Sequence, residues 1–207
     1  TSLDLNISET DREKAKQVGH TVPNSIDVEG DNTSGSFHFM LDLFPFKGSS
    51  FHITAGAYIG KDKIINVYNK YDKDLAEVVA YNNAVASNPL AQTLGLKQVG
   101  VQLGDYLLSP YQTPEGGHVE ANIKVKKIRP YFGIGFGRAV PQKHRFALQF
   151  DLGTQLWGTP KVYMLGLNGE KELTEKDANG NDGGLIKTLS KITVYPCMTL
   201  RLNGRIF

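Results

Sequence analysis

The sequence predicts an all-β protein: an antiparallel up-and-down β-barrel of about eight strands with a short helix in a long loop. Apolar and polar residues alternate through segments of about seven to twelve residues, the periodicity of strands with one apolar face. The 22 glycines, 10 phenylalanines and 9 tyrosines also suit a closed β-architecture better than a helical one. We therefore expect one barrel domain over residues 1–207.

The connections between these segments alternate between tight and long, as in barrels whose turns are short on one side and whose loops grow on the other. The tight connections are Pro45–Ser50, Lys127–Pro130 and Gly158–Pro160. The long connections are Ser8–Gly35, Lys61–His118 and Gly166–Tyr195, and a shorter one lies near Arg138–Arg145. We expect residues 8–35, 61–118 and 166–195 to be the long loops of the barrel.

Three segments of the N-terminal half alternate as strands do. Residues 3–7 are the first, and residues 37–44 and 51–59 flank the turn at Pro45–Ser50. Two alternating runs joined by a Pro- and Gly-containing turn predict a β-hairpin.

The loop over residues 61–118 has a pattern of its own. Asp74 and Glu77 have capping-box spacing, an apolar stripe follows, and Asn88-Pro89 ends it. This pattern predicts a short helix. Residues 99–103 alternate again, either as a further strand or as a β-extension of the loop.

The C-terminal half alternates more regularly. Residues 119–126, 131–137 and 146–153 are each predicted to be a strand, as are residues 162–165 and 198–206.

The two faces of these strands decide the environment, because a soluble barrel turns its apolar face inward and a membrane barrel turns it outward. Gly133, Gly135, Gly137 and Gly153 fall on the polar side, where they leave room for large side chains to converge. A water-facing surface more often carries Lys and Glu than a row of glycines, so the pattern favours the membrane arrangement.

In that arrangement the polar side forms a charged network that fills the lumen, and aromatic residues near the strand ends lie at the membrane interfaces. The expected lumen network is His38, Asp42, His52, Glu120, Lys124, Lys126, Asp151, Arg201 and Arg205. The expected interface aromatics are Phe44, Tyr131, Trp157, Tyr195 and Phe207.

Several C-terminal segments share a pattern with one group of proteins. They are Pro130–Gly137, then Asp151–Gly153 followed by Gly158–Val162, and Tyr195-Pro196 with the terminal Arg205-Ile206-Phe207. These segments resemble small outer-membrane β-barrel proteins of Gram-negative bacteria, of the outer membrane protein A-like type. The resemblance covers residues 37–207 and is strongest after Arg129.

The resemblance implies a place in the outer membrane of the cell envelope, contact with outer-membrane lipid, and recognition of the terminal Phe207 by the barrel-insertion machinery. Proteins of this group have a further strand pair before a segment like Leu3–Ile7. We therefore expect an N-terminal truncation or a missing first hairpin, and ten strands where that hairpin is present. Arg201, Asn203 and Arg205 stand where this group usually has apolar residues.

No metal or cofactor site is expected. His38 and His52 lie on the two strands of one hairpin and with Asp42 would suit zinc, but no fourth ligand has convincing spacing, so we interpret both as hydrogen-bonded lumen histidines. The Asn- and Asp-rich residues 177–184 lack the register of a calcium-binding EF-hand loop. Cys197 is the only cysteine, so no internal disulfide can form.

The favoured function is a non-enzymatic outer-membrane, porin-like barrel with a structural or surface-interaction role, whose residues 61–118 and 166–195 offer room for an extracellular ligand. Two alternatives remain open: a soluble lipocalin-like carrier of a small hydrophobic ligand, and a lipid-modifying envelope hydrolase that pairs Ser109 or Ser190 with His118. A net charge of +2, with its densest basic cluster at residues 124–129, gives no indication of nucleic-acid binding.

Overall fold

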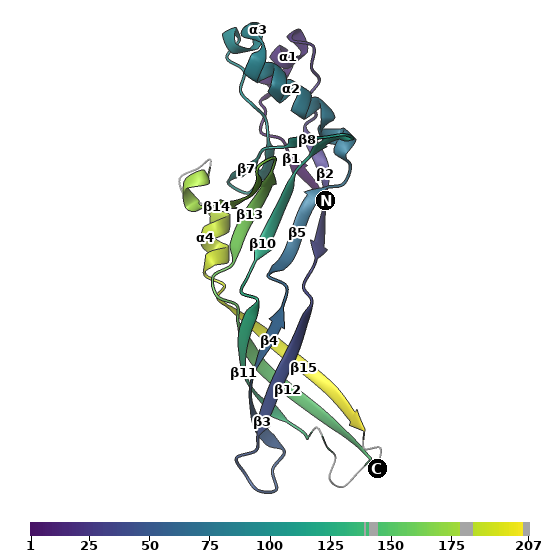
Figure 1. The fold of residues 1–207 in the computed structure, drawn as a ribbon, viewed down its shortest axis with the longest axis vertical. Coiled ribbons are helices and arrows are strands. Elements are labelled where there is room, and N and C mark those ends of the chain that lie inside the picture. The colour runs from purple at the N-terminus through teal and green to yellow at the C-terminus, as the bar shows by residue number, and fades with distance from the viewer. Residues whose placement is uncertain (139, 141–144, 179–183, 205–207) are drawn as a thin grey trace. The chain divides into compact units, whose positions relative to one another are not determined.

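The computed structural model of this protein describes residues 1–138, 140, 145–178 and 184–204 (Figure 1). Strands make up 50% of the structure and helices 21%, and the paired strands of its sheets are antiparallel. The predicted antiparallel β-class is therefore confirmed. No helix among the described residues is both long enough and apolar enough to cross a membrane.

The chain divides into two compact units, and each is built from three separate segments. The helix-bearing unit consists of Thr1–Thr33, Lys63–Lys124 and Lys161–Leu189. The five-stranded unit consists of Ser34–Asp62, Val125–Pro160 and Ser190–Phe207.

A six-stranded sheet forms the framework of the helix-bearing unit. Its strand order is β1-β2-β5-β10-β13-β14. The strands are β1 (Ser2–Asp4), β2 (Ser25–Asn32), β5 (Lys63–Asn69), β10 (Glu120–Lys124), β13 (Lys161–Gly166) and β14 (Gly169–Leu173). Asn122 of β10 lies opposite Asn66 of β5 on one side and Tyr163 of β13 on the other.

Short hairpins and helices complete this unit. The hairpins are β6 (Val101–Leu103) with β7 (Tyr106–Leu108) and β8 (Tyr111–Thr113) with β9 (Gly116–His118). The helices are α1 (Glu9–Gln17), α2 (Ala76–Ser87), α3 (Pro89–Thr93) and α4 (Gly184–Ser190), with the 3-10 turns η1 (Asp72–Leu75) and η2 (Glu175–Asp177).

Helix α2 is the helix that the sequence predicts, with one correction at its start. The predicted capping box at Asp74 and Glu77 does not form, because Asp74 lies inside η1 and Leu75 precedes α2 without a side-chain cap. The end is as predicted: α2 stops before Asn88, whose side chain accepts a hydrogen bond from the Leu90 amide and so begins α3.

The core of the helix-bearing unit is apolar, as in a water-soluble domain. Val78 and Tyr81 of α2 are fully buried, and they belong to one cluster with side chains from the hairpins and the sheet. Among the other members are Ile26, Val28, Val101, Tyr106, Leu108, Val119, Ala121 and Val162.

The three segments predicted as long loops contain much of this unit. Strands β2, β5 and β14 lie within or overlap residues 8–35, 61–118 and 166–195. Their alternation is hard to see in the sequence, because β2 buries only Ile26 and Val28 and β14 only Leu173. The predicted strand at residues 3–7 is shorter in the structure, where it is β1.

The five-stranded unit is a single curled sheet with the order β15-β12-β11-β4-β3 (Figure 1). The strands are β3 (Ser36–Leu43), β4 (Phe51–Gly60), β11 (Ile128–Phe136), β12 (Phe146–Leu156) and β15 (Val194–Gly204). All neighbours are antiparallel. The described strands thus form a half-barrel with β3 and β15 at its edges, and not a closed barrel.

Burial in this sheet is the reverse of burial in the helix-bearing unit. In β12, Gln149 and Asp151 are 0% and 1% exposed, whereas Leu148 and Leu152 on either side of them are 60% and 50% exposed. Strands β4 and β11 follow the same rule, and in the edge strands Asp42 and Arg201 are half-buried while Phe37 is 87% exposed. One face of the sheet is therefore polar and covered, and the other is apolar and open.

Candidate functional site

The covered face of the five-stranded sheet contains a network of polar side chains from four of its strands, which we call the strand network. Its members are Asp42 of β3, His52 and Thr54 of β4, Gln149 and Asp151 of β12, and Arg201 and Asn203 of β15. They share one face because alternate residues of a strand point to the same side.

A glycine brings the two central members together. Gly135 of β11 lies opposite His52 on one neighbouring strand and opposite Asp151 on the other. A Cβ atom at Gly135 would lie 2.4 Å from His52 Nε2 and 2.7 Å from Asp151 Oδ1. Without a side chain between them, the imidazole and the carboxylate meet across β11.

Asp151 is the centre of the network. Its Oδ1 lies 2.7 Å from His52 Nε2, and its Oδ2 accepts a hydrogen bond of 3.0 Å from Arg201 Nη2. The other ring nitrogen of His52, Nδ1, lies 3.2 Å from the carbonyl oxygen of Ser50. Gln149 Nε2 is also 3.3 Å from His52 Nε2. The imidazole ring is therefore held by two side chains of β12 and by the Ser50 carbonyl.

Asp42 joins the edge strand β3 to the same network. Thr54 Oγ1 donates to Asp42 Oδ1 at 2.8 Å, and Gln149 Nε2 donates to Asp42 Oδ2 at 3.1 Å. Asn203 Nδ2 donates to Gln149 Oε1 at 3.2 Å, which connects β12 to the other edge strand. The hydrogen bonds therefore run from one edge of the sheet to the other.

Three members of the network form the one group among the described residues that could hold a metal ion. One ligand atom each from Asp42, His52 and Asp151 lies within 4.8 Å of the other two. His38, the other histidine considered for such a site, lies opposite Tyr58 in the hairpin, six residues along β4 from His52. Thr54, Gln149 and Arg201 already hydrogen bond to these ligands, so the arrangement is suited to fastening strands together.

Glycines also make room for Tyr131, which is 3% exposed. Cβ atoms at Gly133 and Gly153 would lie 2.6 Å and 2.3 Å from its hydroxyl oxygen. This is the role that the sequence predicts for these glycines. A cavity of about 210 Å³ lies beside the ring and is lined by His38, Met40, Tyr58, Tyr131, Thr199 and Arg201.

We expect Gly153→Ala to lower the free energy of unfolding by about 1–3 kcal/mol, because the added methyl group overlaps Tyr131 and the Phe132 carbonyl. A guanidinium titration followed by the fluorescence of Trp157 measures this. Gly30→Ala is the matched control, since a Cβ at that strand glycine would be 3.9 Å from its nearest neighbour. Equal effects of the two substitutions would contradict the prediction.

The remaining residues predicted for the lumen network lie elsewhere. Glu120 and Lys124 belong to β10 of the helix-bearing unit, where Lys124 pairs with Glu170. Lys126 is exposed and its side chain lies over Gly158. Arg205 lies outside the described residues. Four residues of the predicted lumen network therefore belong to the strand network, and Thr54, Gln149 and Asn203, which alternation also puts on the polar side, complete it.

The aromatic residues predicted for the interfaces have different surroundings. Trp157 and Tyr195 stack with their ring centres 4.4 Å apart. Phe44 lies under Arg138, whose guanidinium carbon is 4.7 Å from the ring centre. Tyr131 is the buried ring described above, and Phe207 lies outside the described residues.

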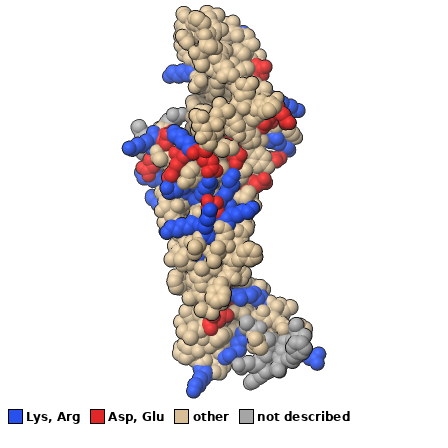
Figure 2. Space-filling view, viewed as in Figure 1, with Lys and Arg blue, Asp and Glu red and all other residues tan. Residues whose placement is uncertain are grey.

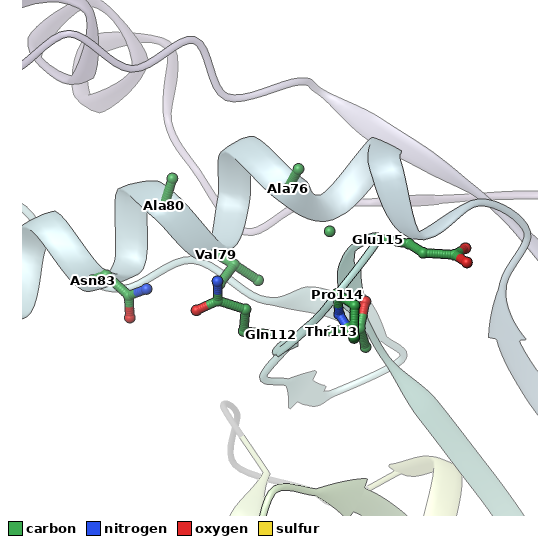
Figure 3. A pocket seen from close by; sticks show the side chains of 9 residues that line it. Ala76, Val79, Ala80, Asn83, Gln112, Thr113, Pro114 and Glu115 are labelled. Atoms are coloured by element: carbon green, nitrogen blue, oxygen red, sulfur yellow. The ribbon is translucent and has the colours of Figure 1, made fainter.

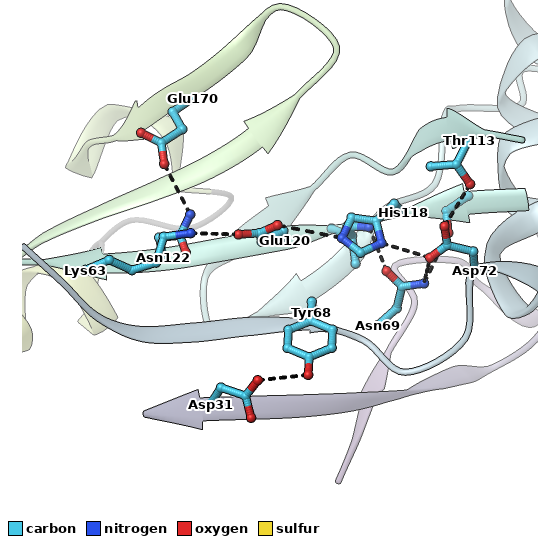
Figure 4. A network of polar contacts seen from close by, with 12 residues as sticks. Asp31, Lys63, Tyr68, Asn69, Asp72, Thr113, His118, Glu120, Asn122 and Glu170 are labelled. Carbon is cyan, nitrogen blue, oxygen red and sulfur yellow. Dashed lines mark hydrogen bonds and ion pairs between the residues drawn. The ribbon is translucent and has the colours of Figure 1, made fainter. Parts of the chain in front are cut away.

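A second polar network lies in the helix-bearing unit, around His118 at the end of β9 (Figure 4). His118 Nδ1 is 2.8 Å from Asp72 Oδ1, and His118 Nε2 is 3.7 Å from Glu120 Oε2. Thr113 and Asn69 also donate to Asp72, at 2.8 Å and 3.2 Å. The hydrogen bonds attach the turn η1 to both strands of the β8–β9 hairpin.

These contacts shift the titration of the two carboxyl groups. Burial alone would raise the pKa of Asp72, but hydrogen bonds from His118, Thr113 and Asn69 outweigh it and hold the pKa below the ordinary value of 3.8. Burial likewise raises the pKa of Glu120, and the ammonium group of Lys63 at 3.0 Å more than reverses this.

Asp72 should therefore stabilise the protein above its unfolded pKa of 3.8, and this contribution should be lost as the pH falls through its lower folded pKa. At neutral pH we expect Asp72→Asn to cost about 1–2 kcal/mol, because charged hydrogen-bond acceptors are stronger than neutral ones. Urea titrations of both proteins across the acid range should show this difference shrink. Asp27→Asn, at an exposed carboxylate, is the control and should show no such trend.

A shallow pocket of about 360 Å³ lies beside this network, between α2 and the β8–β9 hairpin (Figure 3). Its lining is Ala76, Val79, Ala80, Asn83, Gln112, Thr113, Pro114, Glu115 and Gly116. The hydrolase alternative needs a serine beside His118. Ser109 is exposed and does not belong to the network around His118 that the structure describes.

Comparisons with protein-family models, with curated proteins and with solved structures found no match to this chain.

Proposed function

We propose that this chain is an outer-membrane β-barrel protein with a structural or surface-interaction role, and that the five-stranded unit is part of its membrane-spanning wall. The observation that supports this is the reversed burial of that sheet. Phe37, Ile134 and Leu200 are each at least half exposed on the open face, while Asp151 and His52 are covered on the other. Soluble proteins rarely expose an apolar face of this extent, whereas a membrane barrel turns such a face to lipid.

The lengths of the strands fit the same proposal. Strands β4, β12 and β15 contain 10, 11 and 11 residues, which matches the roughly 9–11 residues that a tilted strand needs to cross a bilayer. The polar side chains of the strand network hydrogen bond to one another across the covered face, which suits a narrow lumen without bulk water.

A complete wall needs partners for both edges, because an unpaired strand edge in lipid leaves backbone groups without hydrogen bonds. The edge strands β3 and β15 run in the same direction, because strand direction alternates from each strand to the next and they are the first and fifth of five strands. Antiparallel closure therefore takes an odd number of further strands. Three would give the eight-stranded barrel that the sequence predicts.

The helix-bearing unit is the part that we assign to surface interaction. It has its own apolar core, and its pockets lie beside α2 and beside α1, where a cavity of about 600 Å³ is lined by residues that include Ser8, Asp11 and Lys97. A lipocalin-like carrier would need an apolar lining on the covered face of the five-stranded sheet. Gln149, Asp151 and Thr54 occupy that face instead.

Membrane fractionation tests the proposal. The native protein should be retained in the outer-membrane fraction, and it should change its mobility on an SDS gel when the sample is boiled, because a folded barrel resists the detergent until it is heated. A protein that stays in the aqueous fraction and shows no shift would overturn the proposal. The apolar face would then have to be covered by a partner or a ligand.

A further inference from the structure

The two units carry opposite net charge. The five-stranded unit contains 11 Lys and Arg residues against 3 Asp, a formal charge of +8. The helix-bearing unit contains 12 against 18, a formal charge of −6, and the two values give the +2 of the whole chain. In Figure 2 the red atoms gather over β13 and β14 of the helix-bearing unit, and few lie over β3, β4 and β11.

Most of the negative charge of the five-stranded unit is enclosed. Asp42 and Asp151 are two of its three carboxylates, and both are members of the strand network on the covered face. Asp62 is the third, and it lies after the end of β4. The positive charge on the outside of this unit therefore has almost no acidic counterpart within the unit.

Four exposed lysines gather where β4 ends and where β11 and β15 begin, and we call them the lysine row. They are Lys61, Lys126, Lys127 and Lys191. Backbone hydrogen bonds join the segments that carry them. The Gly60 amide donates to the Lys127 carbonyl at 3.0 Å, the Lys126 amide to the Trp157 carbonyl at 3.1 Å, and the Trp157 amide to the Thr193 carbonyl at 3.0 Å.

One carboxylate is close to the row. Lys127 Nζ lies 3.9 Å from Asp62 Oδ2, with 70% of the lysine side chain exposed. The other three lysines make no ion pair within the part of the chain that the structure describes. Four positive charges at one end of the sheet, with Asp62 as the acidic residue of the five-stranded unit beside them, form a surface complementary to anions.

Exposed apolar residues adjoin the row at the same strand ends. Ile59, Ile128 and Val194 are 53%, 60% and 46% exposed. Apolar side chains followed by lysines match the acyl chains and the head groups of a bilayer. The stacked pair of Trp157 and Tyr195 belongs to the other face, since Tyr195 lies opposite the buried Gln155.

We propose that the lysine row binds the phosphate groups of an anionic lipid at the boundary of the bilayer. The inference rests on the proposed function, and it adds the lipid class that this end of the wall prefers. The adjoining apolar face selects lipid as the anion, because a soluble polyanion would leave that face in water.

The test compares two bilayers that differ in head-group charge. The full chain is folded into vesicles of phosphatidylcholine alone and of phosphatidylcholine mixed with phosphatidylglycerol, at low and at high salt. The mobility shift on heating measures insertion. The emission of Trp157, the only Trp of the chain, reports the surroundings of the lysine row.

We expect insertion into both vesicles, with a rate at least about tenfold higher in the anionic ones at low salt, because each lysine near an anionic surface contributes about fivefold. High salt should remove this preference by screening. Equal rates in both lipids at low salt would overturn the inference and leave the proposed function intact. Failure to insert into either vesicle would contradict the proposed function itself.

A matched pair of variants distinguishes the effect of the lysine row from the effect of the net charge of the chain. The first carries Lys61→Gln, Lys126→Gln, Lys127→Gln and Lys191→Gln. The control carries Lys16→Gln, Lys73→Gln, Lys97→Gln and Lys176→Gln, four exposed lysines of the helix-bearing unit. The first variant should still insert into phosphatidylcholine and should lose its preference for anionic vesicles, while the control keeps it. Equal losses in the two variants would overturn the inference.

Discussion

Replacing Asp151 by alanine should lower the free energy of unfolding by about 3–5 kcal/mol, the cost of removing one partner from a buried ion pair. Asp151 is 1% exposed, and its two carboxylate oxygens bind His52 and Arg201. Without it, His52 Nε2 and Arg201 Nη2 lose their carboxylate partner on the covered face. A guanidinium titration of the folded protein, followed by Trp157 fluorescence, measures the loss.

Two further variants show whether the buried charge is the cause. Asp151→Asn keeps the size of the side chain and one acceptor oxygen, so we expect a loss smaller than that of Asp151→Ala. Asp27→Ala removes an exposed carboxylate of the helix-bearing unit and should cost no more than about 0.5 kcal/mol. An Asp151→Ala protein as stable as Asp27→Ala would mean that the carboxylate of Asp151 does not stabilise the sheet.

Much of the five-stranded sheet could be predicted from its sequence. Its strands are long and alternate strictly, as β12 does from Phe146 to Leu156, and a strictly alternating strand leaves no choice of which residues share a face. The small residues among the polar positions also indicated crowding on that face, and Gly135 and Gly153 are indeed the points where His52 and Tyr131 need space.

The partners within the network could not be predicted, because they depend on register and on strand order. The sequence puts His38 and His52 on facing strands of one hairpin, which would allow them to meet. In the structure β11 lies between β4 and β12, so His52 meets Asp151, which is 99 residues away in the chain. Which residue stands opposite which follows from the complete sheet, and no local pattern contains that information.

The division into two units also could not be predicted from the sequence, for a different reason. Strands β2 and β14 each present one or two apolar side chains to the core, and the remaining positions are polar or charged. Such segments have the composition of loops. They become strands because β5 and β13 pair with them and because α2 and the β6–β7 hairpin supply apolar cover, which are contributions from distant parts of the chain.

A single arginine substitution tests whether the open apolar face meets lipid or water. Leu152 of β12 is 50% exposed and lies between Ile134 and Met198 on the two neighbouring strands. If this face meets lipid, Leu152→Arg should cost about 2–4 kcal/mol, the price of arginine near the middle of a bilayer. The measurement is the guanidinium midpoint of the protein folded into phosphatidylcholine vesicles, together with the temperature of its gel mobility shift.

The control is Leu90→Arg in α3 of the helix-bearing unit. Leu90 is also 50% exposed, so the two substitutions are matched in residue type and in exposure and differ only in surroundings. An arginine at a water-exposed site changes stability by about 0.5 kcal/mol or less. If Leu152→Arg were as mild as Leu90→Arg, the open face would meet water or a hydrated partner. A large loss of stability in Leu152→Arg alone would indicate that Leu152 faces lipid. The arginine at position 90 is harmless because water solvates its charge, and lipid cannot do this at position 152.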